Sequence, residues 1–304
     1  MSTKISVADF LPKFINGAAA SSGHEKNRIL RDVRLMVASL KQVSPEQVQF
    51  SPEDLYLTLK ELQILNEMLI RYNNEEPISK IIHRRFFWKH AFYVNGNVLD
   101  PRPETELIIE SVLEHFDPHL PLRFLDLGTG SGCILLSLLQ EYENSVGVGI
   151  DLSKEAIEVA ERNREMFSKS IAERANFLPM NWNDLGKAQS FGKKDRFNAS
   201  FDVVVGNPPY IRSADIELLP VNVKNYDPIV ALDGGPYGTE SFREIIGIAK
   251  KMLNASGKIF LETGIWQSNV VKRLLQSNGF FCLDIRQDLN GIDRVIVGEM
   301  YSFK

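Results

Sequence analysis

The segment Asn-Pro-Pro-Tyr at residues 207–210 carries the residue types best suited to chemistry, and it directly follows the apolar run FDVVVG. Pro208 restricts Asn207 to extended backbone, and Pro209 restricts Pro208 in the same way. A stiff turn is therefore expected at the end of a buried strand. The Asn207 side-chain oxygen and the Pro208 carbonyl are then fixed acceptors for the two hydrogens of a planar NH2 group, and Tyr210 offers a stacking face.

This pattern favours methylation of an amide or an aromatic amine. The lone pair of such a nitrogen is delocalised, so fixed acceptors are needed to polarise it and turn it toward an electrophile. No strong base is required beforehand, because the nitrogen becomes acidic as it gains the methyl group. The alternative is a structural role, in which the prolines end the strand and Tyr210 packs into the core.

A glycine loop, DLGTGSG at residues 126–132, lies between another predicted strand and a predicted helix. Glycine at positions 128, 130 and 132 permits positive φ and lets a ligand approach the backbone. The spacing differs from the G-x-G-x-x-G of nicotinamide dehydrogenases. The next predicted strand ends at Asp151, whose carboxylate can accept from both hydroxyls of a ribose. Together these features predict a nucleoside cofactor and favour S-adenosylmethionine; a tight turn without a ligand is the alternative.

Short apolar runs alternate with helical patterns after Pro103. RFLDLG, SVGVGID, FDVVVGN, GKIFLET and DRVIVGEM are predicted strands, and helices are expected at 104–116, 132–142, 153–168, 239–253 and 266–277. This alternation predicts an α/β fold, a doubly wound parallel sheet with helices on both faces. The glycine loop, Asp151 and Asn207 then share the carboxyl edge of the sheet, where such folds bind ligands.

The residues before this region have a different pattern. Apolar residues recur at helical spacing up to about Tyr72, which predicts a small helical bundle, and residues 78–100 are interpreted as a strand pair with a turn at NGN (95–97). We therefore expect a helical substrate-recognition domain at 1–76, a β-hairpin linker at 77–102 and a cofactor-binding domain at 103–304.

Composition narrows the function further. The formal net charge of −4 argues against binding nucleic acid by bulk electrostatics. Two cysteines give no disulfide framework, and the five histidines lack the spacing of a metal site, so no metal is expected. No apolar run is long enough to span a membrane, and the first twenty residues do not match a signal peptide. The cytoplasm is the expected location.

These residues resemble a known family, the class I (Rossmann-like) S-adenosylmethionine-dependent methyltransferases with an N-P-P-Y motif, and within it the HemK/PrmC glutamine methyltransferases of peptide-chain release factors. The resemblance runs from about Pro77 to the C-terminus. It rests on EPI (76–78), RFFW (85–88), PRPETE (101–106), DLGTGSG (126–132), NPPYI (207–211) and ALDGGPYG (231–238). N-P-P-Y is shared with DNA and RNA amine methyltransferases, whereas PRPETE ahead of the glycine loop is more specific.

The resemblance implies methyl transfer from S-adenosylmethionine to the glutamine amide of a Gly-Gly-Gln tripeptide in a release factor, with the N-terminal domain helping to grip that partner. We expect the protein to be a monomer. The implied catalytic residues are Asn207, Pro208 and Tyr210. The implied substrate site adds Pro209, Arg102, Pro103 and Thr105. The implied cofactor site consists of Asp126, Gly128, Thr129, Gly130, Gly132, Asp151, Leu152, Asn181, Trp182 and Asn207. Asp126 would pair with the amino group of the cofactor or position the loop amides.

The sequence departs from the family at three positions and leaves alternatives open. Asn181 stands where relatives usually have Asp, His83 where they favour Gly, and Phe86 where they favour Glu. A glutamine of a ribosomal protein is an alternative substrate. Adenine methylation of nucleic acid is another, although no separate basic target-recognition region is visible. A catalytically silent binding module is the alternative from a different class.

Overall fold

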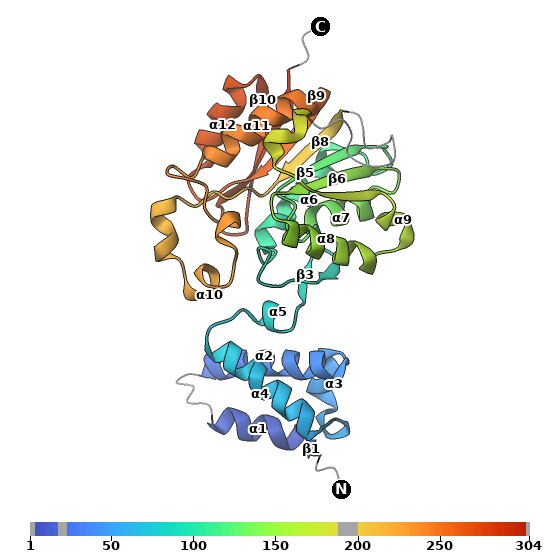
Figure 1. Ribbon diagram of the computed structural model, residues 1–304, viewed down its shortest axis with the longest axis vertical. Coiled ribbons are helices and arrows are strands. Elements are labelled where there is room, and N and C mark those ends of the chain that lie inside the picture. Colours follow the sequence, from blue (N-terminus) through green and yellow to red (C-terminus); the bar gives the residue numbers. More distant parts are fainter. Residues whose placement is uncertain (1–3, 18–22, 188–199, 302–304) are drawn as a thin grey trace. The chain divides into compact units, whose positions relative to one another are not determined.

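The computed structural model describes residues 4–17, 23–187 and 200–301 of the chain. It forms two compact units, Met1–His83 and Arg84–Lys304 (Figure 1). The hairpin that the sequence analysis treats as a linker is grouped with the second unit. The division into functional domains at residues 76 and 102 stays a prediction.

The first unit is helical, with one short antiparallel strand pair. Its elements are β1 (Ile5–Ser6), α1 (Val7–Gly17), α2 (Gly23–Lys41), α3 (Pro45–Phe50), β2 (Tyr56–Leu57), α4 (Leu59–Asn73) and α5 (Ile78–Ile81). The expected apolar stripes form its core, because Val33 and Val37 of α2 are buried together with Leu65 and Leu69 of α4. A capping box at Ser44 begins α3, and a second at Thr58 begins α4.

The second unit begins with a small hairpin of β3 (Arg85–Phe87) and β4 (His90–Phe92). A strand pair was expected here and is present; NGN forms a turn at Gly96 and Asn97, but it is not the turn that joins the two strands. The chain reverses at Trp88 and Lys89, where Trp88 takes a φ of 55°. Packing of aromatic side chains explains the position of this turn, because Phe87 and Phe92 are buried together with ring centroids 6.1 Å apart.

A seven-stranded sheet forms the centre of the second unit, in the order β10-β11-β9-β8-β5-β6-β7 (Figure 1). Its strands are β5 (Arg123–Leu127), β6 (Val146–Asp151), β7 (Ala175–Pro179), β8 (Phe201–Gly206), β9 (Leu253–Glu262), β10 (Phe280–Gln287) and β11 (Asp293–Met300). The five predicted strands are confirmed, and β7 and β10 were missed. The expectation of a parallel sheet needs correction for β11, which is antiparallel to both neighbours. Only a short loop joins β10 to β11, and such a connection requires antiparallel pairing.

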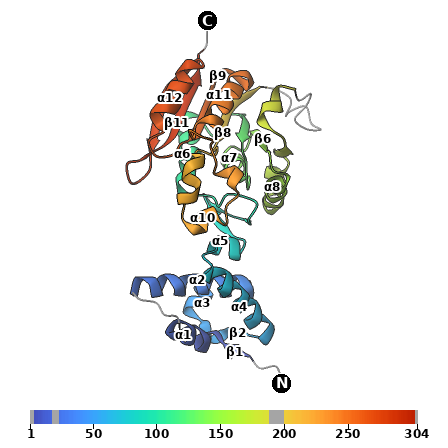
Figure 2. The ribbon, with the colours of Figure 1, turned by 60° about the vertical axis from the view of Figure 1, so that its left-hand side comes forward.

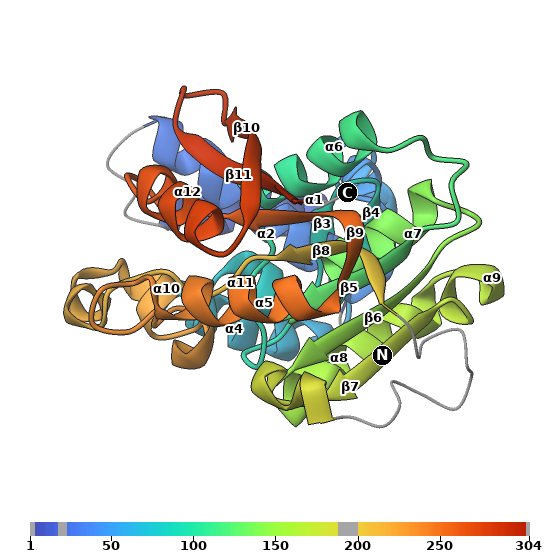
Figure 3. The same cartoon turned by 90° about the horizontal axis from the view of Figure 1, so that it is seen from above.

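Helices cover both faces of this sheet, as expected for a doubly wound fold. They are α6 (Glu106–His115), α7 (Cys133–Glu141), α8 (Lys154–Met166), α9 (Lys169–Ala172), α11 (Glu240–Met252) and α12 (Ser268–Ser277), whereas the short α10 (Val221–Lys224) lies away from the sheet. One core joins α6, α7 and α8 to one face, and a second joins α11 and α12 to the other. Figure 3 shows α6 and α11 on opposite sides of β8 and β9, and Figure 2 shows α12 beside β11.

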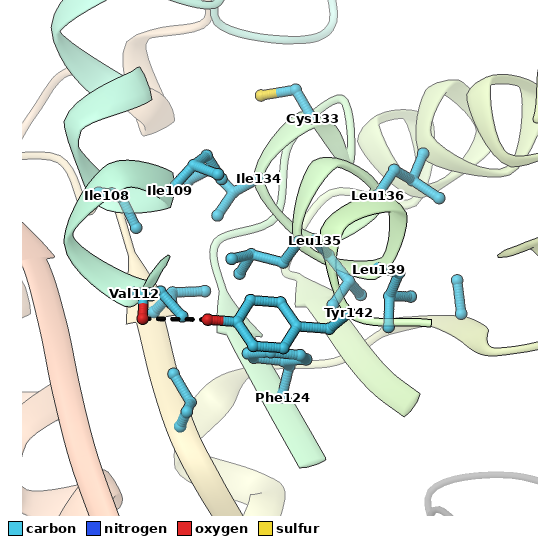
Figure 4. Packing of buried hydrophobic residues seen from close by; sticks show 14 of the residues in the cluster. Ile108, Ile109, Val112, Phe124, Cys133, Ile134, Leu135, Leu136, Leu139 and Tyr142 are labelled. Atoms are coloured by element: carbon cyan, nitrogen blue, oxygen red, sulfur yellow. Dashed lines mark hydrogen bonds between the residues drawn. The ribbon is translucent and has the colours of Figure 1, made fainter. Parts of the chain in front are cut away.

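Tyr142, directly after α7, is fully buried at the centre of the first of these cores (Figure 4). Its ring meets Phe124 of β5 edge to face, with centroids 5.4 Å apart. Its hydroxyl lies 3.0 Å from the carbonyl oxygens of Val112 and Phe116 at the end of α6. One phenol therefore joins the end of α6 to α7 and β5.

We expect Tyr142→Phe to lower the free energy of unfolding by about 1–2 kcal/mol, because it removes a buried hydroxyl that hydrogen-bonds to the Val112 and Phe116 carbonyl oxygens. Urea denaturation followed by circular dichroism measures this change. Tyr237→Phe is the control, since its side chain is 76% exposed, and it should change the free energy by less than about 0.5 kcal/mol. Equal effects of the two substitutions would show that the hydroxyl of Tyr142 does not stabilise the fold.

Candidate active site

Three parallel strands bring the predicted site together. β5 lies between β6 and β8, with Leu127 opposite Ile150 on one side and Asp126 opposite Val205 on the other. The loops after these strands therefore emerge at one edge of the sheet. They line a cavity of about 360 Å³, which is within the usual size range for small-molecule sites.

The glycine loop after β5 adopts the conformation that its sequence predicts. Gly128, Gly130 and Gly132 have φ values of 78°, 53° and 77°, in the left-handed region that favours glycine. A Cβ at Gly132 would come within 2.8 Å of the Phe177 ring, whereas a Cβ at Gly130 would meet nothing within 4 Å. Gly132 is thus required by packing, and Gly130 leaves open space beside the cavity.

Asp126 lies beneath this loop rather than in the cavity. It is fully buried, and its Oδ2 accepts a hydrogen bond of 2.6 Å from the Thr129 hydroxyl. Its Oδ1 is buried without a hydrogen-bond partner in the described structure. Burial raises the pKa of this carboxyl to about 7. Of the two roles considered for Asp126, positioning of the loop matches this geometry.

Asp151, at the end of β6, faces the cavity from the other side of the loop. Its two oxygens accept from the backbone N–H groups of Gly130, at 2.9 Å, and Ser153, at 3.0 Å. Burial raises its pKa, and these hydrogen bonds oppose that shift. A carboxylate oxygen has two lone pairs, so each oxygen retains one for a ribose hydroxyl.

The far end of the cavity is lined by Asn181, Trp182 and Asn183. Trp182 is fixed by Glu244 of α11, which accepts from its indole Nε1 at 2.6 Å. Glu244 also accepts from Asn183 at 3.1 Å. The side-chain oxygen of Asn181 accepts from the backbone of Asn183, at 2.9 Å, so Asn181 shapes this turn.

The Asn-Pro-Pro-Tyr segment leaves β8 and is held by the loop at residues 227–234. Ile211 forms a parallel bridge with Asp233. Gly234 fits closely against the segment, because a Cβ there would lie 2.7 Å from the Pro209 carbonyl oxygen. Gln267 donates to the Tyr210 carbonyl at 2.9 Å. These contacts add to the stiffness that the two prolines provide.

Side-chain hydrogen bonds connect this segment to PRPETE and to the end of β9. Asn207 donates from Nδ2 to Thr105 at 3.2 Å, and Thr105 donates to Glu262 at 2.6 Å. The Tyr210 hydroxyl donates to the other oxygen of Glu262 at 3.3 Å. Burial raises the pKa of Glu262 to about 7. Arg102 pairs with the buried Asp227 at 2.7 Å, which fixes PRPETE to the 227–234 loop.

Most of the predicted site residues line one cavity. They are Arg102, Thr105, Gly128, Thr129, Gly130, Asp151, Leu152, Asn181, Trp182, Asn207 and Pro209. Pro103, Asp126, Gly132, Pro208 and Tyr210 do not line it, although all adjoin residues that do. Tyr210 instead lines a second hollow of about 500 Å³, together with Tyr237 and Trp266.

Sequence reasoning missed several residues of the site. Asn97 lines the cavity, although NGN was interpreted only as a hairpin turn, and so does Glu244. Glu262 is the most informative omission. It is an acidic residue at the carboxyl end of a parallel strand, which is the same signal that singled out Asp151.

The cavity fits S-adenosylmethionine. Gly130 leaves room for a ligand against the backbone, Asp151 offers carboxylate oxygens for a ribose, and Trp182 presents an aromatic side chain. Within residues 4–17, 23–187 and 200–301, no group of three His, Cys, Asp or Glu side chains is placed to hold a metal ion. No helix in that part of the chain is long and apolar enough to cross a membrane.

The buried Asp126 should make stability depend on pH. Its pKa is raised from an ordinary value of 3.8 to about 7 in the folded protein. Between these values the unfolded chain has lost the proton that the folded protein retains. The stability that neutral Asp126 contributes is therefore complete below pH 3.8 and is lost as the pH rises through about 7.

We expect Asp126→Asn to remove this dependence. The Tm of the cofactor-free variant, minus that of the wild type, should increase from about pH 5 to about pH 8. Thermal denaturation across this range measures the difference, and Asp117→Asn, at an exposed position, is the control with a constant difference. A constant difference for Asp126→Asn would show that this carboxyl is already ionised at low pH.

Known proteins share this architecture and these motifs. Residues 119–290 match the methyltransferase domain family. A release factor glutamine methyltransferase from Caulobacter vibrioides is 38% identical over 268 residues, covering 88% of each chain. That of Rhodospirillum rubrum is 36% identical, over 91% of this chain and 80% of the relative. The release factor glutamine methyltransferase of Agrobacterium fabrum is 32% identical, over 88% of this chain and 89% of the relative. The chain therefore belongs to the release factor glutamine methyltransferase family of S-adenosylmethionine-dependent enzymes.

Proposed function

We propose that this protein transfers a methyl group from S-adenosylmethionine to the side-chain amide nitrogen of the glutamine in the Gly-Gly-Gln tripeptide of a peptide-chain release factor. The observation that carries the proposal is that Asn207 lines the same cavity as the glycine loop and Asp151. A planar amide held by Asn207 is then next to a nucleoside site. The similarity to release factor glutamine methyltransferases over most of the chain supports this substrate.

The glycine loop, Asp151 and Trp182 would hold the cofactor. Gly130 allows close approach to the backbone, and the Asp151 oxygens accept from the ribose hydroxyls. Asp126 acts indirectly, because it holds Thr129 and therefore the loop. Leu152 is 61% exposed beside the same cavity and would cover an apolar face of the cofactor. When bound, S-adenosylmethionine supplies an electrophilic methyl group on a positively charged sulfur.

Asn207 and Pro208 would hold the substrate amide. The Asn207 side-chain oxygen and the Pro208 carbonyl oxygen accept the two hydrogens of the glutamine NH2 group, which polarises this group and orients the nitrogen lone pair toward the methyl group. The same acceptors stabilise the hydrogens as they become acidic during transfer. Because the segment is already fixed, little reorganisation is required at the moment of reaction.

The proposal also covers the roles of the domains, the oligomeric state and the location of the enzyme. We infer that residues 1–76 help to grip the release factor, that residues 77–102 link the domains, and that residues 103–304 carry the chemistry. We also infer that the enzyme acts as a monomer in the cytoplasm. The formal net charge of −4 favours a protein substrate over nucleic acid. Competition between a release factor and a ribosomal protein in one assay distinguishes the two glutamine substrates.

We expect Asn207→Ala to lower kcat at least about 100-fold, as the loss of a fixed polar group at a reacting centre does in other enzymes. The cofactor Kd should change less than about threefold, because other residues hold the nucleoside. Mass spectrometry of the tryptic Gly-Gly-Gln peptide measures turnover, and isothermal titration calorimetry measures binding. Asn144→Ala, remote from the cavity, should retain wild-type turnover.

The peptide assay also tests the substrate. A release factor with Ala in place of the tripeptide glutamine should gain no methyl group. Methylation that persists on this altered factor would overturn the proposed substrate, and full activity of Asn207→Ala would overturn the role of Asn207.

A further inference from the structure

We propose that Glu262 is a positioning residue that fixes the orientation of the Asn207 carboxamide through the hydroxyl of Thr105. This inference rests on the proposed function, because the orientation matters only if Asn207 accepts from a substrate amide. It concerns a residue that lies beyond the cavity wall and that no motif in the sequence singled out.

The three residues form one chain of hydrogen bonds that connects three segments of the second unit. Glu262 ends β9 and is 1% exposed, and Thr105, in the 3-10 turn Pro103–Thr105, is 3% exposed. The Thr105 Oγ1 atom lies 2.6 Å from Glu262 Oε2 and 3.2 Å from Asn207 Nδ2. Asn207 directly follows β8 and is half-buried.

The direction of this chain follows from the chemistry of its members. A carboxylate only accepts hydrogen bonds, and a threonine hydroxyl has one hydrogen to give. When Thr105 gives that hydrogen to Glu262, its oxygen can only accept from Asn207. The NH2 of Asn207 must therefore face Thr105, and its oxygen is left for the cavity.

A defined direction is needed because the two ends of a carboxamide have nearly the same shape but opposite polarity. Rotation by half a turn would present an NH2 group to the substrate NH2, which would repel it. The Glu262 carboxylate removes this ambiguity without touching the substrate.

Glu262 also holds the other end of the Asn-Pro-Pro-Tyr segment. Its Oε1 accepts from the Tyr210 hydroxyl at 3.3 Å. The Tyr210 ring packs against Gly264, where a Cβ would lie within 2.9 Å of the ring. A single buried carboxylate thus connects both the first and the last residue of the segment.

The charged surroundings allow Glu262 to ionise near neutral pH. Burial raises its pKa to about 7, Thr105, Tyr210 and Arg294 lower it, and Glu104 raises it. Assays at about pH 8 therefore examine the ionised, accepting form.

The test uses buried substitutions of nearly equal size in the full-length protein. Thr105→Val removes the hydroxyl, Thr105→Ser retains it, and Glu262→Gln introduces an NH2 that can donate to Thr105 and reverse the chain. Thr263→Val is the matched control, because Thr263 is 1% exposed, adjoins Glu262, and has a hydroxyl without a hydrogen-bond partner in the described structure. We measure kcat and KM for a release factor, and the cofactor Kd, at about pH 8.

We expect Thr105→Val and Glu262→Gln to lower kcat about 10- to 100-fold with little change in cofactor Kd. Thr105→Ser should recover most of the kcat that Thr105→Val loses, and Thr263→Val should match the wild type. Full kcat in Thr105→Val, or an equal loss in Thr105→Ser, would overturn the inference. Methylation by the wild type is scored separately, and its absence would overturn the proposed function instead.

A second readout does not depend on turnover. In ¹⁵N spectra the side-chain NH2 signals of Asn207, assigned by their loss in Asn207→Ala, report the hydrogen bond to Thr105. These signals should move in Thr105→Val and in Glu262→Gln and stay near their wild-type positions in Thr105→Ser and Thr263→Val. Signals that stay in place in Thr105→Val would overturn the inference even if the enzyme proved inactive on release factors.

Discussion

The parallel pairing of β5 with β8 is the constraint on which the site depends. Leu125 lies opposite Val204, so the glycine loop begins just after one strand and Asn207 just after its neighbour. Neighbouring parallel strands place their following loops at one edge. Under the proposed function, a cofactor held by the first loop and an amide held by the second would therefore be adjacent. The pairing of β5 with β6 adds Asp151 at the same edge.

Two buried carboxylates fix these loops from beneath. Asp126 receives the hydroxyl hydrogen of Thr129, and Glu262 receives that of Thr105, each at 2.6 Å. One carboxylate thus holds the glycine loop, and the other is connected to the Asn-Pro-Pro-Tyr segment. Burying a carboxylate is costly, and burial raises both pKa values to about 7.

Much of the fold could be predicted from sequence because its strongest patterns are local. The strands β5, β6 and β8 are mostly apolar runs that are buried on both faces, and glycine is favoured at 128, 130 and 132 by positive φ. β10 was missed because this edge strand, FFCLDIRQ, is neither a continuous apolar run nor a regular alternation of polar and apolar residues. The hairpin turn was misplaced because tertiary packing of Phe87 and Phe92, rather than the NGN signal, decides it.

The site was only partly predictable for a related reason. Motifs identify residues that stand together in the sequence, such as 207–210 and 126–132. Glu262 is separated from Thr105 by 157 positions, so only the fold brings them together. The role of Asp126 was left open between ligand and loop, and its burial beneath Thr129 indicates the loop.

The most direct measurement is a crystal structure of the enzyme with S-adenosylhomocysteine and a Gly-Gly-Gln peptide. The side-chain nitrogen of the glutamine should lie within hydrogen-bond distance, about 3 Å, of both the Asn207 oxygen and the Pro208 carbonyl oxygen. The Asn207 NH2 should remain on Thr105. A glutamine bound elsewhere, or an Asn207 carboxamide turned away from the cavity with both ligands present, would contradict the account.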